Sequence, residues 1–243
     1  MRVKAVVEYL GGSHVGWQRQ PGLPSIQSAL EEAIKTATGQ AAHVEGAGRT
    51  DSGVHAAGQV AAFELIDGTD LYRLRASLNG LTPNEISVLT LEEAKPSFDP
   101  RRDARCRTYS YTVVAGRPRS PLLAGRCWYV TTGLDPELLG RLAAAVVGRH
   151  DFSAFRAADC EAPTTVREVT DSRWESDGGR FVYRISATAF LKQMVRVLVG
   201  SMVDVSLGKL DERDFVGLLD GGSRDNAGRT APAAGLTLVR VDY

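Results

Sequence analysis

The sequence predicts an α+β protein built from two halves, each with a mainly antiparallel sheet. Strand-like alternation and helical periodicity follow one another through the first part of the chain, and the same rhythm returns in the second part. The glycine-rich stretch DGG at 177–179 lies between two alternating runs, which indicates a hairpin and therefore antiparallel neighbours. We expect the halves to comprise residues 1–98 and 99–243, joined near the proline-bearing stretch 96–100.

The first half begins with a half-buried strand. Residues 2–9 place Val3, Val7 and Tyr9 on one face and mostly polar side chains on the other. Ser25 can cap a helix that runs to about Thr38 and ends at a glycine. Further elements are predicted as a strand at 59–65, a short helix at 71–78 and a strand at 86–91.

The second half repeats this order of elements. Asp135 followed by Pro136 is typical of a helix start, and this helix ends before Gly148. The hairpin pairs residues 166–175 with residues 180–188. The remaining elements are predicted as strands at 105–114, 127–131 and 236–241 and helices at 191–207 and 211–219.

Composition points to an ordinary soluble protein. Hydrophobic residues make up 43% of the chain and charged residues 24%. The N-terminus lacks an apolar signal segment, and no run reaches the ~18 apolar residues of a membrane span, so we expect a cytoplasmic location without membrane contact. Cys106, Cys127 and Cys160 include no Cys-x-x-Cys pair, so neither a disulfide framework nor a zinc site is indicated.

Positive charge is concentrated locally although the total is balanced. Lys plus Arg and Asp plus Glu both equal 29, which gives no general support for nucleic-acid binding. Between residues 101 and 126, however, seven arginines face a single acid, Asp103. Such clustering suits phosphate contacts, because salt confines the influence of each charge to about 10 Å. A solvated basic strand and loop would explain this feature alone about equally well.

The stretch GAGRTDSGVH at 46–55 carries the strongest candidate for chemistry. Its glycines allow a sharp turn, and Arg49 lies two residues before Asp51, where it can keep the carboxylate ionised and orient it. An ionised carboxylate held in this way can attack an electron-poor carbon. Without further context, an ordinary structural ion pair in a surface turn would be the commoner explanation.

Several blocks together resemble the TruA-type family of tRNA pseudouridine synthases. Besides the loop at 46–55, the matching blocks follow the family's order and cover nearly the whole chain. They are GWQRQ at 16–20, SIQ at 25–27, RTYSY at 107–111, HDFSAF at 150–155, FLKQMVR at 190–196 and TAPAAGL at 230–236. Ser52 departs from this pattern, since the family usually has alanine there.

The resemblance implies both a fold and a reaction. The family's fold is two α+β halves whose sheets associate around a positively charged RNA-binding cleft. The reaction is the isomerisation of uridine to pseudouridine at positions 38–40, in the anticodon stem-loop of tRNA, by a homodimer. Because an isomerisation exchanges no electrons or phosphoryl groups with a third molecule, no cofactor and no metal ion are required.

The resemblance also assigns roles to individual residues. It implies that Asp51 is the nucleophile, that Arg196 is the partner of this carboxylate, and that Tyr109 stacks on the target base. Attack at C1′, attack at C6 and a glycal path begun by proton loss at C2′ all stay open. Taken alone, Tyr109 would more often belong to a buried stripe with Tyr111 and Val113, and Arg196 could equally be a surface arginine.

The remaining candidates concern RNA contacts and scaffolding. Arg49 can contact the flipped nucleotide or fasten its own loop, and phosphate contacts are expected from Arg101, Arg105 and Arg107. Trp17, His55 and His150 are interpreted as packing or hydrogen-bonding residues rather than as acids or bases.

Two rival functions fit fewer of these features. A noncatalytic RNA-binding protein would leave the Asp51 loop and Arg196 unexplained. A carboxylate-dependent glycoside or nucleoside hydrolase normally needs a second acid, and none is evident near Asp51.

Overall fold

The computed structural model describes all 243 residues and divides into two compact units. The first comprises Met1–Arg105 and Thr237–Tyr243, and the second comprises Cys106–Leu236. The division expected from the sequence, 1–98 and 99–243, assigned residues 99–105 and the closing strand to the second half. The structure groups both of these segments with the first unit, because the closing strand pairs there.

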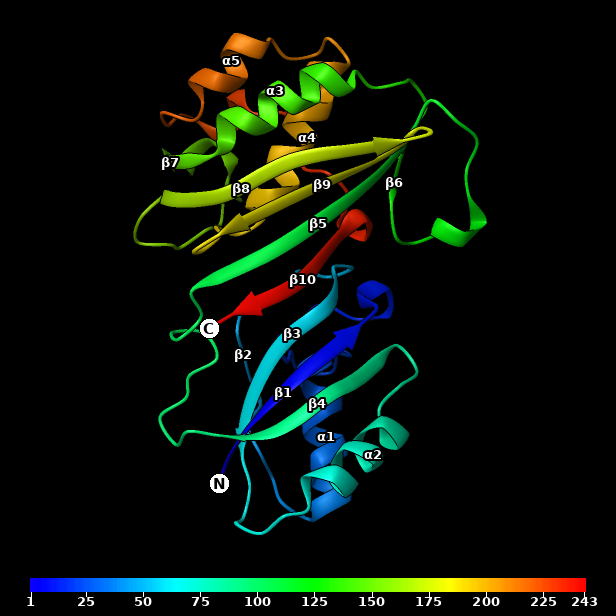
Figure 1. Ribbon diagram of the computed structural model, residues 1–243, viewed down its shortest axis with the longest axis vertical. Helices are drawn as coiled ribbons and strands as arrows, with labels where there is room; N and C mark the ends of the chain where they lie inside the picture. Colours follow the sequence, from blue (N-terminus) through cyan, green and yellow to red (C-terminus); the bar gives the residue numbers. More distant parts are fainter. The chain divides into compact units, whose positions relative to one another are not determined.

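A four-stranded sheet forms the centre of the first unit, in the order β4-β1-β3-β10 (Figure 1). Strands β1 and β4 pair antiparallel, as do β1 and β3, whereas β10 runs parallel to β3 with Thr237 opposite His55. A short strand, β2, pairs antiparallel with β3 at Ala61 and Ala62, near the end of β3. These strands are β1 (Arg2–Tyr9), β2 (Glu45–Gly46), β3 (His55–Glu64), β4 (Ile86–Ala94) and β10 (Leu236–Asp242).

Two helices complete the first unit. The helix α1 (Ile26–Thr38) starts at Ser25, whose side chain accepts a hydrogen bond from the Ser28 backbone, and it ends at Gly39 with a left-handed backbone. The helix α2 (Leu71–Leu81) packs against both α1 and β4. Alternate residues of β1 are buried, as the sequence pattern predicts, so the core of this unit lies between the sheet and its helices.

The second unit has an antiparallel sheet in the order β5-β9-β8-β7, with β6 parallel to β5. The predicted hairpin forms, with a turn at Gly178 and Gly179, which both have positive φ. Helices α3, α4 and α5 gather on one side of this sheet (Figure 1). These strands are β5 (Cys106–Ala115), β6 (Trp128–Val130), β7 (Gly148–Asp151), β8 (Val166–Asp177) and β9 (Arg180–Ala187). The helices are α3 (Pro136–Val146), α4 (Met194–Ser206) and α5 (Glu212–Gly217).

The α+β class and the mainly antiparallel pairing predicted from the sequence are confirmed. Two helix boundaries differ from the expected ones by three residues: α2 ends at Leu81 instead of residue 78, and α4 begins at Met194 instead of residue 191. Gln193 precedes it with φ of 60°, the one residue other than glycine with a positive φ, and this left-handed backbone interrupts helical geometry before Met194. No helix is long and apolar enough to cross a membrane.

Candidate active site

Asp51 lies in the loop that connects β2 to β3 in the first unit. The Val54 amide donates to the Asp51 carbonyl at 3.1 Å, which closes a four-residue turn, and Gly53 supplies the positive φ of 79° that this turn requires. The Asp51 residue is half-buried, whereas Arg49 is exposed. The loop therefore presents its carboxylate on a fixed turn.

Residues from the N-terminal segment hold this loop in place. The hydroxyls of Tyr9 and Thr50 are 2.8 Å apart in the protein interior, and the Trp17 amide donates to the Thr50 carbonyl at 3.1 Å. Gly16 has φ of 102°, and a Cβ at this position would lie 2.4 Å from the Thr50 carbonyl oxygen. Only glycine therefore allows the two segments to approach this closely.

Further bonds fix both ends of the loop. Gln59 on β3 donates from Nε2 to the Gly48 carbonyl at 2.8 Å. The Gly11 amide donates to Nδ1 of buried His55 at 3.0 Å, which gives His55 a scaffolding contact. Ser52 donates from its hydroxyl to the His14 carbonyl at 3.2 Å. This hydrogen bond also joins the N-terminal segment to the loop.

Glu31 on α1 binds two segments that precede the Asp51 loop in the chain, the one that contains Arg19 and the one that contains Val44. Its carboxylate accepts from the Arg19 guanidinium at 3.0 Å and from the Val44 amide at 3.1 Å, while the Gln27 side-chain amide donates at 3.0 Å. The Glu31 side chain is only 10% exposed. A buried carboxylate with several donors is costly to disturb, because loss of one partner leaves the others unsatisfied. Sequence reasoning missed Glu31 as well as Tyr9.

Tyr109 lies on β5 of the second unit and is half-buried. Its ring meets Phe190 edge to face, with the centroids 5.0 Å apart and an interplanar angle of 83°. Tyr111 and Val113 on the same strand are fully buried, so they form the core stripe, while Tyr109 keeps part of its surface accessible. The contact with Phe190 fixes the orientation of an aromatic ring at the border of the core.

Tyr111, two residues after Tyr109 on β5, has a structural role. Its hydroxyl donates to the Pro232 carbonyl at 2.7 Å, and a Cβ on Gly235 would lie 2.4 Å from its ring. Burial raises the pKa of Tyr111 far above its ordinary value of 10, although the positive charge of Arg196 opposes this rise. Tyr111 is therefore a neutral donor that fastens the chain before β10.

Arg196 lies in the first turn of α4 and is half-buried between the buried residues Val195 and Val197. Its Nε donates to the Ala231 carbonyl at 2.9 Å, and the Ala231 amide donates back to the Arg196 carbonyl at 3.0 Å. The placement at the edge of the apolar stripe agrees with the helical pattern of the sequence. The block at 230–236 thus acts as a support for the arginine helix.

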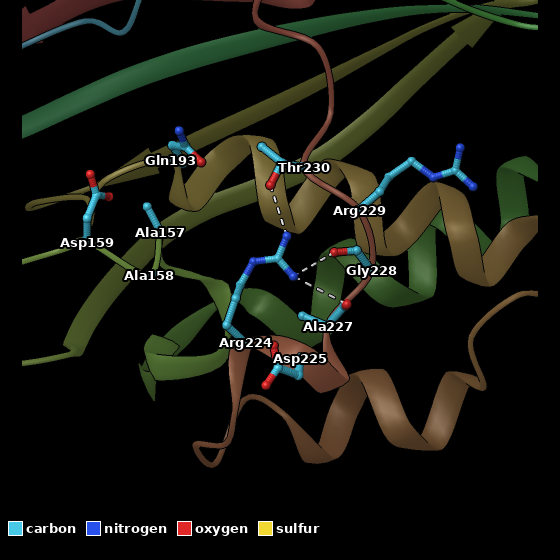
Figure 2. Close-up of a pocket in the computed structure, with 10 residues that line it drawn as sticks. All are labelled: Ala157, Ala158, Asp159, Gln193, Arg224, Asp225, Ala227, Gly228, Arg229 and Thr230. Atoms are coloured by element: carbon cyan, nitrogen blue, oxygen red, sulfur yellow. Dashed lines mark hydrogen bonds between the residues drawn. The ribbon is translucent and has the colours of Figure 1, made fainter.

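Polar side chains hold the chain before Ala231 in place, and Figure 2 shows the hydrogen bonds that Arg224 makes within this segment. Arg224 donates to the Gly228 carbonyl and to the Thr230 hydroxyl, both at 2.9 Å. Asp204 on α4 accepts from the Arg229 amide at 3.0 Å and pairs with the Arg229 guanidinium at 2.7 Å. A cavity of about 560 Å³ lies beside these residues and is lined in part by Gln193, Arg224 and Thr230.

The predicted phosphate-binding arginines differ in their surroundings. Arg101 and Arg105 are exposed, and the Arg101 amide is held by the Asp99 carboxylate at 2.8 Å. Arg107 on β5 is half-buried and donates to the Thr188 carbonyl at 2.9 Å. Asp51, Arg49, Arg101 and Arg105 thus belong to the first unit, and Arg107, Tyr109 and Arg196 belong to the second.

Comparison with known proteins defines the class to which this fold and site belong. A family model described as tRNA pseudouridine synthase matches residues 5–101 and 142–243. This chain belongs to the tRNA pseudouridine synthase family, a family of isomerases.

Individual relatives narrow the similarity further. The chain is 44% identical over 243 residues to tRNA pseudouridine synthase A of Myxococcus xanthus, covering 100% of this chain and 92% of that protein. It is 40% identical over 242 residues to tRNA pseudouridine synthase A of Geotalea uraniireducens, covering 100% and 99%. The protein of the same name from Acetivibrio thermocellus is 38% identical over 241 residues, covering 99% of each.

Proposed function

We propose that this protein isomerises uridine to pseudouridine at positions 38–40 in the anticodon stem-loop of tRNA, with Asp51 as the nucleophile. In this reaction the bond between C1′ and N1 breaks, the base turns over, and a bond between C1′ and C5 forms. The proton on C5 leaves, and N1 gains a proton, so atoms and charges balance without a third reactant. The observation that carries the proposal is the Asp51 turn, whose preceding residue, Thr50, is hydrogen-bonded by Tyr9 and Trp17.

Preorganisation of the Asp51 loop supports a catalytic role for its carboxylate. Catalysis by a nucleophile requires that the attacking atom be held near the reacting carbon, because small displacements of that atom lower the reaction rate strongly. The close approach at Gly16 and the Tyr9–Thr50 hydrogen bond restrict such displacements. The carboxylate attacks C1′ or C6, or it starts a glycal path by removing a proton from C2′.

Arg196 is proposed as the partner that keeps this carboxylate ionised. Its Nε is already bound to the Ala231 carbonyl, which fixes the direction of the guanidinium group. A planar guanidinium with a fixed orientation suits recognition of a carboxylate.

Tyr109 is proposed to stack on the everted uracil. Its ring is half-buried and oriented by Phe190, so stacking would cost little side-chain entropy. Base stacking on an aromatic ring is worth about 1 to 3 kcal/mol. A Tyr109→Phe variant should keep this contribution, and Tyr109→Leu should lose most of it.

RNA contacts, assembly and location follow the family resemblance. Arg49 is proposed to contact the flipped nucleotide, and Arg101, Arg105 and Arg107 are proposed to contact phosphates. We expect a homodimer in the cytoplasm that requires no cofactor. Light scattering at micromolar concentration should give twice the mass of one chain, and a single-chain mass would contradict this assembly.

Tritium release from tRNA labelled at C5 of uracil tests the proposal directly. The wild type should release tritium, and Asp51→Asn should release none while still binding tRNA. Glu93→Gln, which changes an exposed acid on β4 of the same unit, is the matched control and should react like the wild type. Equal release by Asp51→Asn and the wild type would reject Asp51 as the nucleophile.

A double-mutant cycle tests the proposed pair. If Arg196 acts through the Asp51 carboxylate, Arg196→Ala should slow the wild type strongly but have little further effect on Asp51→Asn. Additive losses in rate would show that the two side chains act independently.

A further inference from the structure

A second basic surface in the second unit lies apart from the residues assigned to catalysis. Residues 106–134 of this unit contain four arginines and no acid. Three of these arginines, Arg117, Arg119 and Arg126, belong to the loop at 116–126 between β5 and β6, and all three are exposed. We call this loop the basic arm. It projects from the sheet at the end of β5 (Figure 1, green).

Hydrogen bonds within the basic arm and from the arm to β6 and to the hairpin turn hold it in place. The hydroxyl of Tyr129 on β6 donates to the Ser120 carbonyl at 2.6 Å and accepts from the Ser120 amide at 2.9 Å. Arg117 donates to the Gly178 carbonyl at 2.9 Å, and Arg126 donates to the Leu122 carbonyl at 2.7 Å. A loop ordered before binding pays less entropy when a ligand arrives.

A cavity of about 400 Å³ adjoins the arm through Tyr129, which lines it. Its other lining residues include Trp128, Lys209 and Arg229. The Arg229 guanidinium lies 6.0 Å from the centroid of the Trp128 ring and is paired with Asp204, whose side chain is 8% exposed. Figure 2 shows the Arg229 side chain pointing away from Arg224, and Arg229 lines both this cavity and the neighbouring one. We call this second space the Trp128 cavity.

The charges and groups of this surface define one kind of ligand. Arg119 and Lys209 are exposed, Arg229 is 45% exposed, and Asp204 pairs with Arg229. The exposed Asp135 lies nearby, but its side chain caps α3 by accepting from the amides of Glu137 and Leu138. Clustered cations beside an aromatic ring are the features that bind a sugar-phosphate backbone and an unpaired base.

We propose that the basic arm and the Trp128 cavity form an RNA-binding surface that holds the substrate at a distance from the target base. Tyr109 lies seven residues before the arm along β5, which corresponds to about 20 Å at the usual rise of a strand. The surface therefore contacts phosphates beyond the nucleotide that Tyr109 would hold. The inference rests on the proposed function, since the ligand is the tRNA substrate.

Salt-dependent binding of full-length tRNA tests this surface. The double variant Arg119→Ala, Lys209→Ala should raise Kd roughly five- to tenfold at 0.1 M salt, because two phosphate contacts are lost. The slope of log K against log salt should become less steep by about 1.4 to 1.8. The charge reversal Arg119→Glu should raise Kd further. A control double variant, Lys35→Ala with Arg213→Ala, removes two exposed cations from α1 and α5 and should bind like the wild type.

The possible results separate this inference from the proposed function. If the wild type releases tritium and both double variants share its Kd and salt slope, the RNA surface is rejected and the synthase assignment stands. If the wild type binds tRNA but releases no tritium, while the arm variant loses affinity and slope, the synthase assignment is rejected and the RNA surface stands. Circular dichroism spectra identical to that of the wild type exclude misfolding as the cause of a loss.

Discussion

The hydroxyl groups of Tyr9 and Thr50 lie 2.8 Å apart and buried, and this hydrogen bond joins the end of β1 to the residue before Asp51. Tyr9→Phe should lower the free energy of unfolding by about 1 to 2 kcal/mol, because the Thr50 hydroxyl loses a partner in the interior. It should also lower kcat, since the Asp51 turn gains freedom. Urea unfolding and single-turnover tritium release measure the two effects. Thr50→Val combined with Tyr9→Phe should cost less than the sum of both single changes, and strict additivity would contradict direct coupling.

Gly16→Ala should remove activity and destabilise the first unit. A methyl group at this position would lie 2.4 Å from the Thr50 carbonyl oxygen, on a backbone with φ of 102°. We expect a loss of more than about 3 kcal/mol, from strain together with displacement of the loop. Gly12→Ala is the control, because Gly12 is exposed and its Cβ would have no neighbour within 4 Å. Similar melting curves for these two variants would refute the argument.

Glu31→Gln should raise KM for tRNA more than it lowers kcat. The amide cannot replace the ion pair with Arg19, so the loop at 16–20 loses one of its contacts with α1. The free energy of unfolding should fall by about 1 to 3 kcal/mol. Glu32→Gln changes the neighbouring exposed acid and should behave like the wild type. Steady-state kinetics over a range of tRNA concentrations separate KM from kcat, and an unchanged KM would count against this positioning role.

A pair of helix glycines should respond to alanine with opposite signs. In α4, a Cβ at Gly200 would lie 1.8 Å from the Arg229 carbonyl oxygen, so Gly200→Ala must displace the segment that supports Arg196. In α3, Gly140 is exposed with no neighbour within 4 Å, so Gly140→Ala should stabilise by about 0.5 to 1 kcal/mol through helix propensity. Thermal unfolding followed by circular dichroism checks both signs, and a stabilised Gly200→Ala would overturn the packing argument.

At low pH, protonation of Asp151 should lower the free energy of unfolding. Its pKa lies below the ordinary value of 3.8, mainly because the Thr165 hydroxyl donates to the carboxylate, with further bonds from Ser153. Stability from a lowered pKa is present above the unfolded value and is lost as pH falls through the folded value. Asp151→Asn should therefore show a flatter dependence of unfolding free energy on pH below about pH 4. Denaturant titrations between pH 2 and 6 measure this, with Asp177→Asn in the hairpin turn as the control. A slope equal to that of the wild type would exclude Asp151 as a source of acid sensitivity.

Local signals predicted much of the secondary structure. Ser25 and Gly39 bound α1, Asp135 with Pro136 starts α3, and paired glycines turn the β8–β9 hairpin, as the sequence pattern indicates. Each of these signals depends on backbone preferences within a few residues, so a single sequence reveals it.

Features that depend on distant partners were not predictable in the same way. β3 begins at His55, four residues before the expected start, because its first residues pair with β10. β2 has only two residues and is defined by its pairing with β3, so it is too short for a periodic sequence pattern to predict it. Among the candidate site residues, Asp51 could be proposed from its loop alone, whereas Tyr9 and Glu31 required contacts between segments that are far apart in sequence.

The pairing of β10 with β3 has a consequence for biosynthesis. Ribosomes make residues 237–243 only after the whole of Cys106–Leu236, yet these residues supply the strand beside His55. A nascent chain of the first hundred residues therefore exposes the unpaired edge of β3 next to the Asp51 loop. The first unit therefore cannot complete its sheet from residues 1–105 alone, and it needs residues 237–243 to cover the edge of β3.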